Sequence, residues 1–274
     1  MNELRYAVVG HPIEHSRSPE IHLAFAQQEG IALSYERILA PLDGFKAVAQ
    51  AFFAEGGTGL NITLPFKGDA YEFVDEHTER ARAALAVNTI SKLPNGKLLG
   101  DNTDGVGIVS DILHNLDCPL IARRVLILGA GGAVRGVLQP ILAQLPLSVT
   151  IANRNLDRAK ALVAQFEGHQ IDIMAYDELA GHEFDVIING TSSSLHNELP
   201  PIPKGIFTEK TLAYDMVYGA GLTEFLKRAQ SEKAGILADG LGMLVEQAAA
   251  SYEIWRGYKP ETRAITNALR EQLA

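Results

Sequence analysis

The chain has 274 residues, of which 47% are hydrophobic and 21% are charged, a balance typical of a globular protein with a substantial core. Its formal net charge of −9 at pH 7 argues against nucleic acid as the main partner, because phosphate backbones require a basic surface. The one cysteine excludes a framework of internal disulfides and fits a reducing compartment. Without a secretory leader or a membrane-length apolar run, we expect a cytoplasmic protein with no membrane partner.

Strands and helices are predicted to alternate in the first part of the chain. We predict strands at 4–9, 33–39 and 59–63, and helices at 20–28, 42–55, 69–75 and 78–85. Ser18 is placed to cap the first helix and Gly30 to close it. A hairpin over 87–99 turns at Pro94–Gly96 and leads to a helix over 106–116. This alternation predicts a mostly parallel sheet with helices on its faces.

A second α/β unit is predicted after Pro119. Its strands are expected at 124–128, 148–152, 170–174, 184–188 and 211–215, and its helices at 132–145 and 155–166. Two further helices, at 241–255 and 260–273, exceed what this unit needs. We therefore predict two domains: residues 1–104, completed by the returning helices of 241–274, and residues 105–240.

A glycine-rich turn follows the apolar strand 124–128. It consists of Gly129, Ala130, Gly131, Gly132 and Ala133. Glycines allow a sharp turn and close ligand approach, and the N-terminus of the following helix favours a phosphate. The pattern indicates a seat for the pyrophosphate of a dinucleotide. An ordinary tight turn is the alternative, because Val134 occupies the third-glycine position of G-x-G-x-x-G.

The end of the next strand indicates which dinucleotide would bind. Asn153 lies 24 positions after Gly129 (153 − 129 = 24), near the place where an acidic residue would bind the ribose of NAD. Arg154 and Arg158 stand there instead, and guanidinium groups pair with a 2′-phosphate. The sequence favours NADP. The alternative is a solvated helix face with Asn153 as its N-cap.

Two charged residues are the candidates for chemistry. Lys67 and Asp104 both follow strands of the first domain, at the edge where open α/β sheets bind ligands. Reduction of a ketone leaves an alkoxide, so the site requires a proton donor, and an ammonium group can stabilise the developing charge. Asp104 could orient Lys67 and hold a substrate hydroxyl. A surface ion pair is the alternative interpretation.

Three other polar clusters occur in the sequence. Ser16 and Ser18, near a helix start, could bind a carboxylate, although a serine before proline also occurs at helix starts without a ligand. His11 and His15 lack a third ligand and flank Pro12, so we predict no metal site. Ser192–Ser194 lack a G-x-S-x-G context, which argues against a serine hydrolase.

Seven phrases in order resemble the shikimate dehydrogenase family and together span nearly the whole chain. They are Ile13–Pro19, Asn61–Lys67, Val87–Thr89, Gly100–Gly105, Gly129–Ala133, Asn153–Arg154 and Asp239–Ala248. The resemblance implies an enzyme that reduces 3-dehydroshikimate to shikimate with NADPH, in aromatic amino acid biosynthesis. It implies a substrate-binding and catalytic first domain, and a Rossmann-like NADP-binding second domain.

The resemblance also implies roles for single residues. Lys67 and Asp104 would be the catalytic pair. The substrate would be bound by Ser16, Ser18, Thr63, Asn88, Tyr218 and Gln247. The cofactor would be bound by Gly129 to Ala133, by the phosphate-binding segment Asn153, Arg154, Asn155 and Arg158, and by Met216 and Gly240 at the nicotinamide, with Glu79 nearby. The partners implied are small molecules, with the chain working as a monomer or a homodimer.

Three departures from the family pattern leave alternatives open. Leu85 replaces a glycine, Asn155 replaces a threonine in the phosphate-binding segment, and Ala220-Gly221-Leu222 lacks a proline. The first alternative is a paralogue of the same fold that acts on quinate or an aminoshikimate, or that accepts NAD. A non-catalytic NADPH-binding sensor is a further alternative, although it would not require both Lys67 and Asp104.

Overall fold

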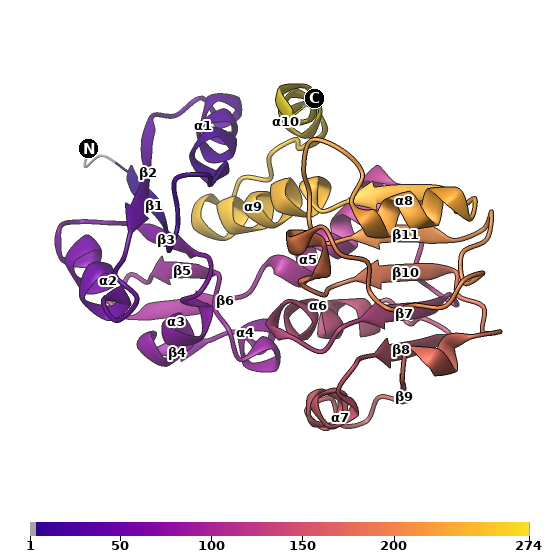
Figure 1. Cartoon of the computed structure of the whole chain (residues 1–274). Helices are drawn as coiled ribbons and strands as arrows, with labels where there is room; N and C mark the ends of the chain where they lie inside the picture. Colours follow the sequence, from indigo (N-terminus) through magenta and orange to yellow (C-terminus); the bar gives the residue numbers. More distant parts are fainter. Residues whose placement is uncertain (1–3, 274) are drawn as a thin grey trace. The chain divides into compact units, whose positions relative to one another are not determined.

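Two six-stranded sheets organise the chain in the computed structural model, which describes residues 4–273 (Figure 1). Each sheet belongs to one unit: residues up to Gly107 with Val245–Ile265 form the first, and Ile108–Leu244 with the residues from Thr266 form the second. The chain first passes from one unit to the other after Gly107, three residues beyond the boundary predicted at residue 104. The two units are described separately below.

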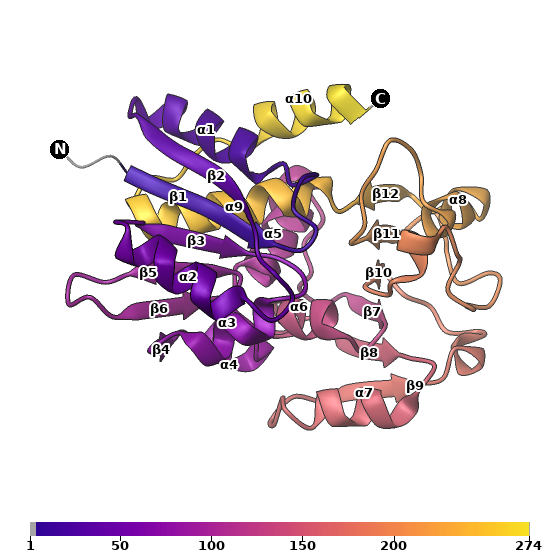
Figure 2. The same ribbon diagram turned by 60° about the vertical axis from the view of Figure 1, so that its left-hand side comes forward.

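The first unit contains a mixed sheet in the order β2-β1-β3-β5-β6-β4 (Figure 2). Only β5 runs against the other strands, as predicted for a mostly parallel sheet. Its strands are β1 (Leu4–Gly10), β2 (Leu33–Leu39), β3 (Gly59–Ile62), β4 (Glu76–His77), β5 (Thr89–Lys92) and β6 (Leu98–Asp101). Its helices are α1 (Ser18–Glu29), α2 (Phe45–Ala54), α3 (Lys67–Phe73), α4 (Glu79–Ala84), the start of α5 (Asp104–Ser110) and most of α9 (Leu241–Arg256).

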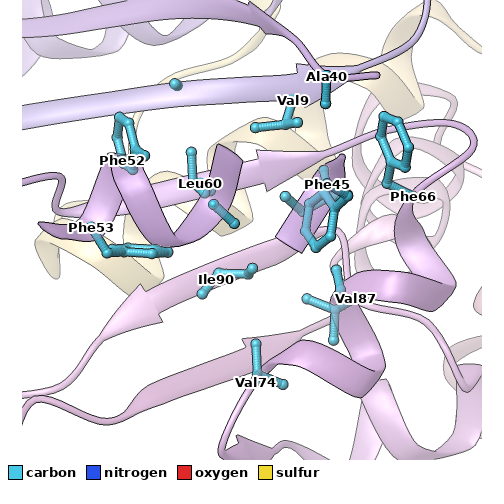
Figure 3. Packing of buried hydrophobic residues seen from close by; sticks show 14 of the residues in the cluster. Val9, Ala40, Phe45, Phe52, Phe53, Leu60, Phe66, Val74, Val87 and Ile90 are labelled. Carbon is cyan, nitrogen blue, oxygen red and sulfur yellow. The ribbon is translucent and has the colours of Figure 1, made fainter. Parts of the chain in front are cut away.

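Alternation along β1 creates two separate hydrophobic cores. Ala7 and Val9 face one core, where α2 supplies phenylalanines (Figure 3). Tyr6 and Val8 face the other, where Trp255 from α9 stacks on Tyr6 with ring centroids 4.7 Å apart. Because successive strand side chains point to opposite faces, this sheet must be covered on both sides. Helix α9, far away in sequence, supplies the second cover.

The second unit has a wholly parallel sheet in the order β12-β11-β10-β7-β8-β9. Numbered from β7, this is the 3-2-1-4-5-6 order of Rossmann folds. Its strands are β7 (Arg124–Leu128), β8 (Ser148–Ala152), β9 (Ile171–Met174), β10 (Val186–Asn189), β11 (Leu212–Asp215) and β12 (Ile236–Asp239). Its helical segments are η1 (Asp111–Asn115), α6 (Gly132–Leu142), α7 (Leu156–Val163), η2 (Asp177–Leu179), η3 (Ser193–His196), α8 (Glu224–Ser231) and most of α10 (Arg263–Leu273).

Several local features differ from the sequence predictions. The cap of α1 is Arg17 without a side-chain bond, and Ser18 is the first helical residue, so the prediction that Ser18 caps the helix is wrong. Gly30 closes α1 in the left-handed conformation, which confirms that prediction. The sequence did not predict β4, α8 or β12. Helix α5 begins at Asp104 and continues into a π-helical turn, η1.

The two C-terminal helices separate between the units. Most of α9 belongs to the first unit, because its aromatic side chain Trp255 packs on the sheet there. From Thr266 onward α10 belongs to the second unit instead. The physical cause is an ion pair, in which the Arg270 guanidinium donates to both oxygens of Asp239 at the end of β12. Leu269 of the same helix is buried, with 1% of its surface exposed.

A buried histidine lies in the aromatic core of the first unit. His22 on α1 is 1% exposed, and its ring stacks on Tyr35 with centroids 4.4 Å apart and an interplanar angle of 10°. Burial lowers the pKa of His22 to about 3, against a smaller opposing effect of Asn61. The imidazole is therefore neutral in the folded protein at pH 7.

We predict that His22 makes the fold less stable in acid. The unfolded chain exposes this ring, whose pKa then returns to about 6.5, so only the unfolded state takes up a proton as the pH falls toward 3. At roughly 1.4 kcal/mol per pH unit, the loss between pH 7 and pH 5 is about 2 kcal/mol. His22→Phe keeps an aromatic ring and cannot titrate. Urea unfolding at both pH values should show a smaller loss for this variant, and equal losses would contradict the assignment.

Candidate active site and cofactor site

The candidate catalytic residues meet in the first unit. Lys67 begins α3, just after the turn that follows β3, and Asp104 begins α5, just after β6. The Lys67 Nζ atom lies 2.5 Å from Asp104 Oδ2, and the two side chains are 27% and 13% exposed. The pair is therefore largely shielded from water and still accessible to a ligand. This arrangement differs from that of an ordinary surface ion pair, whose partners are well solvated.

Asn88 holds the Asp104 carboxylate from the other side. Its Nδ2 donates to Asp104 Oδ1 at 2.8 Å, while its Oδ1 accepts from the backbone N–H of Thr103 at 2.9 Å. Since the backbone N–H can only donate and a carboxylate accepts, these two partners determine which way the amide points. Gln247 from α9 brings its Oε1 to 3.4 Å from the same Nδ2. Four of the predicted residues thus form one contiguous cluster.

Of the two predicted serines, Ser16 lies in the loop after β1 and Ser18 is the first residue of α1. Ser16 Oγ donates to Ser18 Oγ at 3.2 Å, and it accepts from the Ser18 N–H at 3.3 Å. The Arg37 guanidinium donates twice to the Ser16 carbonyl, at 2.8 and 2.6 Å, which restrains the loop. Two hydroxyls at the start of α1 can donate to an anion, as a carboxylate site requires.

Thr63 is half-buried where β3 ends, next to the turn that leads to Lys67. Its methyl group requires a glycine in β1, because a Cβ at Gly10 would lie 2.5 Å from Thr63 Cγ2. The two strand ends therefore approach closely, and the Thr63 N–H donates to the Val9 carbonyl at 2.9 Å. Thr63 therefore lies at the carboxyl edge of the sheet.

Sequence reasoning missed the polar residues that support this cluster. Asn61 Nδ2 donates to the Asn88 carbonyl at 3.2 Å and to Ser251 Oγ at 3.1 Å, and its Oδ1 accepts from the Tyr35 hydroxyl at 2.7 Å. Two signals were available. Asn61 interrupts an otherwise apolar strand, and Ser251 follows Gln247 by four positions, on the same face of α9.

Glu79 does not join this cluster through any hydrogen bond or ion pair that the structure gives between residues 4 and 273. It is exposed at the first residue of α4, after the N-cap Thr78. Its neighbour Arg80 forms a bidentate ion pair with Asp101: Nε donates to Oδ1 at 3.0 Å and Nη2 donates to Oδ2 at 2.6 Å. The cofactor contact of Glu79 stays a prediction.

In the second unit, the glycine turn joins β7 to α6 at the point where the strand order reverses. Gly129 has φ +104°, which favours glycine, and Gly131 caps α6 without a side-chain bond. A Cβ at Gly132 would meet nothing within 4 Å, so the space above the turn is open. The first N–H groups of α6 therefore lack side-chain caps, as a phosphate seat requires. The residues present fit the pyrophosphate of a dinucleotide.

Val134 is accommodated by a glycine elsewhere. Val134 is fully buried, and a Cβ at Gly190, which follows β10, would lie only 2.6 Å from Val134 Cγ2. The third glycine of the motif ordinarily allows close packing of helix and strand. Here the glycine that allows this packing is Gly190, which follows strand β10, and helix α6 can therefore carry valine at position 134.

The arginines lie at the start of α7, after β8. Arg158 Nε donates to the Ala130 carbonyl of the glycine turn at 3.1 Å, so its guanidinium lies over that turn. The N-cap is Asn155, whose side chain accepts from the Arg158 N–H at 3.1 Å, and the alternative with Asn153 as N-cap is wrong. Arg154 is exposed, and no carboxylate pairs with it among residues 4–273. Its guanidinium is available to an anionic ligand.

Met216 and Gly240 are neighbours at the ends of β11 and β12. A Cβ at Gly240 would lie 2.2 Å from the Met216 carbonyl oxygen, so only glycine allows these two segments to touch. Met216 Sδ lies 3.2 Å from the position of a Cβ at Gly190. Tyr218 follows in the same loop and is half-buried. The structure thus brings together the two residues predicted at the nicotinamide.

The fold and these groups define a dinucleotide-dependent dehydrogenase, with a Rossmann-like sheet in one unit and a shielded Lys–Asp pair in the other. Three family models match the chain: a shikimate dehydrogenase substrate binding domain at residues 8–90, shikimate/quinate 5-dehydrogenase at 112–197, and a shikimate 5′-dehydrogenase C-terminal domain at 240–270. The chain belongs to the shikimate dehydrogenase family.

Relatives and solved structures agree over nearly the full length. A shikimate dehydrogenase (NADP(+)) of Chromobacterium violaceum is 61% identical, covering 98% of this chain and 99% of its own. The crystal structure of an enzyme from Pseudomonas putida is 46% identical, with a TM-score of 0.94, covering 97% and 98% of the two chains. That of shikimate 5-dehydrogenase from Thermus thermophilus, in complex with NADP(H) and shikimate, is 32% identical with a TM-score of 0.87, covering 98% and 100%. The predicted family and fold class are confirmed.

Among residues 4–273, no helix is long and apolar enough to cross a membrane. Within the same range, histidine, cysteine, aspartate and glutamate side chains form no group of three that could hold a metal ion.

We predict that Gly190 and Val134 are energetically coupled. Gly190→Ala should destabilise the protein by about 1–3 kcal/mol, because its methyl group would overlap Val134 Cγ2. In a Val134→Ala background the obstructing methyl is absent, so the same substitution should cost less. Urea unfolding of the two single variants and the double variant measures this coupling, and additive effects would contradict the packing explanation.

Proposed function

We propose that this chain catalyses the NADPH-dependent reduction of 3-dehydroshikimate to shikimate, and the reverse oxidation, in the biosynthesis of aromatic amino acids. The observation that carries the proposal is the Lys67–Asp104 pair, shielded from water and oriented by Asn88, in a chain of this family. A chain that only bound NADPH as a sensor would not require this pair.

Lys67 acts at the oxygen of the substrate's ring ketone. NADPH supplies the hydride when it is bound. As negative charge develops on the ketone oxygen, the Lys67 ammonium stabilises it and provides the proton that completes the alcohol. Asp104 accepts from Lys67 through Oδ2, and Asn88 holds Oδ1, so the ammonium is aimed before the reaction begins. In the oxidation direction, the same pair removes the proton.

The remaining residues of the first unit orient the substrate. Ser16 and Ser18 hold its carboxylate with their hydroxyls, which the Arg37–Ser16 contact keeps at the start of α1. The ring hydroxyls are bound by Thr63, Asn88 and Gln247, and Tyr218 of the second unit contributes to substrate binding. In this proposal the first unit supplies most of the substrate-binding residues, and the second unit binds NADP.

NADP is the cofactor, and three features of the second unit support this assignment. The open turn at Gly131 and Gly132 receives the pyrophosphate on the N-terminus of α6. Arg154 and Arg158, with Asn153 and Asn155, receive the adenosine 2′-phosphate. Met216 and Gly240 border the nicotinamide. Glu79 is kept as a prediction of a further cofactor contact.

We also keep two predictions from the sequence. The protein is expected to work in the cytoplasm, as a monomer or a homodimer, with small molecules as its ligands. Gel filtration with light scattering would test the oligomeric state.

The reaction itself is tested by following the absorbance of the reduced cofactor. We expect turnover with 3-dehydroshikimate and NADPH, and slower turnover with 3-dehydroquinate or with NADH. A preference for 3-dehydroquinate would identify a quinate dehydrogenase, which the matched shikimate/quinate family model also describes. Tight NADPH binding without turnover of either substrate would refute the enzyme and support a sensor.

Lys67→Ala should lower kcat by about 10²- to 10⁴-fold with a much smaller change in KM, because the ammonium acts mainly in the transition state. Steady-state kinetics with 3-dehydroshikimate and NADPH measure both constants. Lys97→Ala is the matched control, since Lys97 is exposed in the β5–β6 hairpin of the same unit and pairs with Glu76. Unchanged kcat in the Lys67 variant would exclude Lys67 as the proton donor.

Arg154→Ala should raise KM for NADPH by roughly 10- to 100-fold, the effect of losing a hydrogen bond between charged groups. KM for NADH, which lacks the 2′-phosphate, is the internal control and should change little. The ratio of the two constants, measured on one preparation, is the decisive quantity. An equal rise for both cofactors would refute the role of Arg154.

A further inference from the structure

A second polar cluster, which the proposed chemistry does not use, lies at the ends of β10 and β11. At its centre is Asp215, the last residue of β11, whose side chain is fully buried. No lysine, arginine or histidine pairs with this carboxylate in the part of the chain that the structure describes. A buried carboxylate is costly unless hydrogen bonds replace its water, so its retention calls for a physical reason.

Four donors surround the Asp215 carboxylate. Oδ2 accepts from Ser194 Oγ and Thr223 Oγ1, both at 2.6 Å, and from Asn189 Nδ2 at 3.3 Å. Oδ1 accepts from the backbone N–H of Val217 at 3.1 Å. Every donor is neutral, and the donors come from three different segments of the chain. The carboxylate therefore joins these segments, since hydrogen bonds to a charged acceptor are the stronger kind.

Two of these bonds close one loop, residues 216–222. Val217 lies at its start and Thr223 immediately after its end, and both donate to the same side chain. Thr223 also caps α8 by accepting from the Leu226 N–H at 3.3 Å, so the far end of the loop is anchored to a helix. Within the loop, Gly219 and Gly221 add backbone freedom and no proline restricts it. We call the four hydrogen bonds to the Asp215 carboxylate the Asp215 clamp. This clamp restrains a loop whose glycines would otherwise allow it many conformations.

The other two hydrogen bonds come from Asn189, the last residue of β10, and from Ser194 in η3. They connect Asp215 to the segment that follows β10. Asn189 donates to Asp215, and its Oδ1 accepts from the N–H and the hydroxyl of Thr191, at 3.1 and 2.7 Å. Gly190, between them, packs against Met216. The Asp215 carboxylate is thus bonded both to the 216–222 loop, which contains Met216, and to the segment after β10, which packs against Met216.

We infer that Asp215 is a positioning residue for hydride transfer: it holds the 216–222 loop so that Met216 and Tyr218 fit the nicotinamide and the substrate. The inference rests on the proposed function, in which these two residues border the reacting groups. Asp215 itself is fully buried and touches neither ligand. Its effect is transmitted through Val217, Thr223 and Asn189.

The test weakens the clamp and measures the two halves of the cofactor separately. Thr223→Val keeps the shape of the side chain and removes the hydroxyl, while Thr223→Ser keeps the hydroxyl and is the matched control. We expect Thr223→Val to raise KM for NADPH and to lower kcat, for a combined loss of about tenfold or more in kcat/KM. Adenosine 2′,5′-bisphosphate lacks the nicotinamide, so its Kd should stay within about twofold of that of the wild type.

Thr223→Ser should restore both constants, and Ser194→Ala, which removes a donor outside the loop and its helix cap, should show a smaller loss of the same kind. Ser194→Ala decides the question if Thr223→Val does not fold. A lowered melting temperature with unchanged kcat and KM would show that the cluster only stabilises the fold, and would overturn the inference. An equal loss of affinity for adenosine 2′,5′-bisphosphate would overturn it too.

The outcome is separable from that of the proposed function. If the wild type turns over neither ketone, the proposed function fails, and the Kd of NADPH relative to that of adenosine 2′,5′-bisphosphate still reports on the loop. Thr223→Val should then weaken only NADPH binding. Equal Kd ratios in variant and wild type would overturn the inference in that case.

Discussion

Parallel strands end at one edge of a sheet, and both candidate sites depend on this constraint. In the first unit it brings together the residues that follow β1, β3 and β6, which include Ser16, Thr63 and Asp104. In the second unit it collects the glycine turn after β7, Arg154 after β8 and Met216 after β11. Helices begin at several of these positions, so their N-terminal N–H groups and positive dipole ends lie at the same edge. The carboxyl edge is thus prepared for anionic ligands before any side chain is considered.

Near the carboxyl edge of each sheet, a buried polar side chain orients the groups that contact a ligand. Asn88, 2% exposed, receives the Thr103 N–H on one side and aims its own N–H at Asp104 on the other. Asp215 does the same for the loop after β11, with four donors around one carboxylate. Such networks are costly when incomplete, and satisfied ones restrict the chain to one arrangement. In both cases, a buried side chain holds partly exposed residues in one orientation: Asn88 holds Asp104, and Asp215 holds the 216–222 loop.

Val134, which departs from the G-x-G-x-x-G motif, and two of the three departures from the family pattern have local explanations. Val134 fits because Gly190 leaves space for its methyl group. Asn155 serves as the N-cap of α7, a role that asparagine fills as well as threonine does. Leu85, in the first unit, adopts the left-handed conformation at the end of α4, with φ +47°, where glycine is ordinarily preferred. None of these three residues has a hydrogen bond to Lys67 or Asp104 that the structure gives among residues 4–273.

The sequence by itself determined the type and order of most elements, because hydrophobic periodicity and glycine or proline signals are local. It also determined the family, since its ordered motifs each combine several residues, and it singled out Lys67, Asp104 and Arg154 by residue type and position after a strand. It did not predict β12 or α8, although Phe225, Leu226 and Ala229 are spaced on one buried face of α8. Only the tertiary structure decided that Ser251 of α9 supports Asn61, that α10 joins the second unit, and that Asp215 closes a loop. Those outcomes depend on contacts between residues far apart in the chain, for which no local pattern exists.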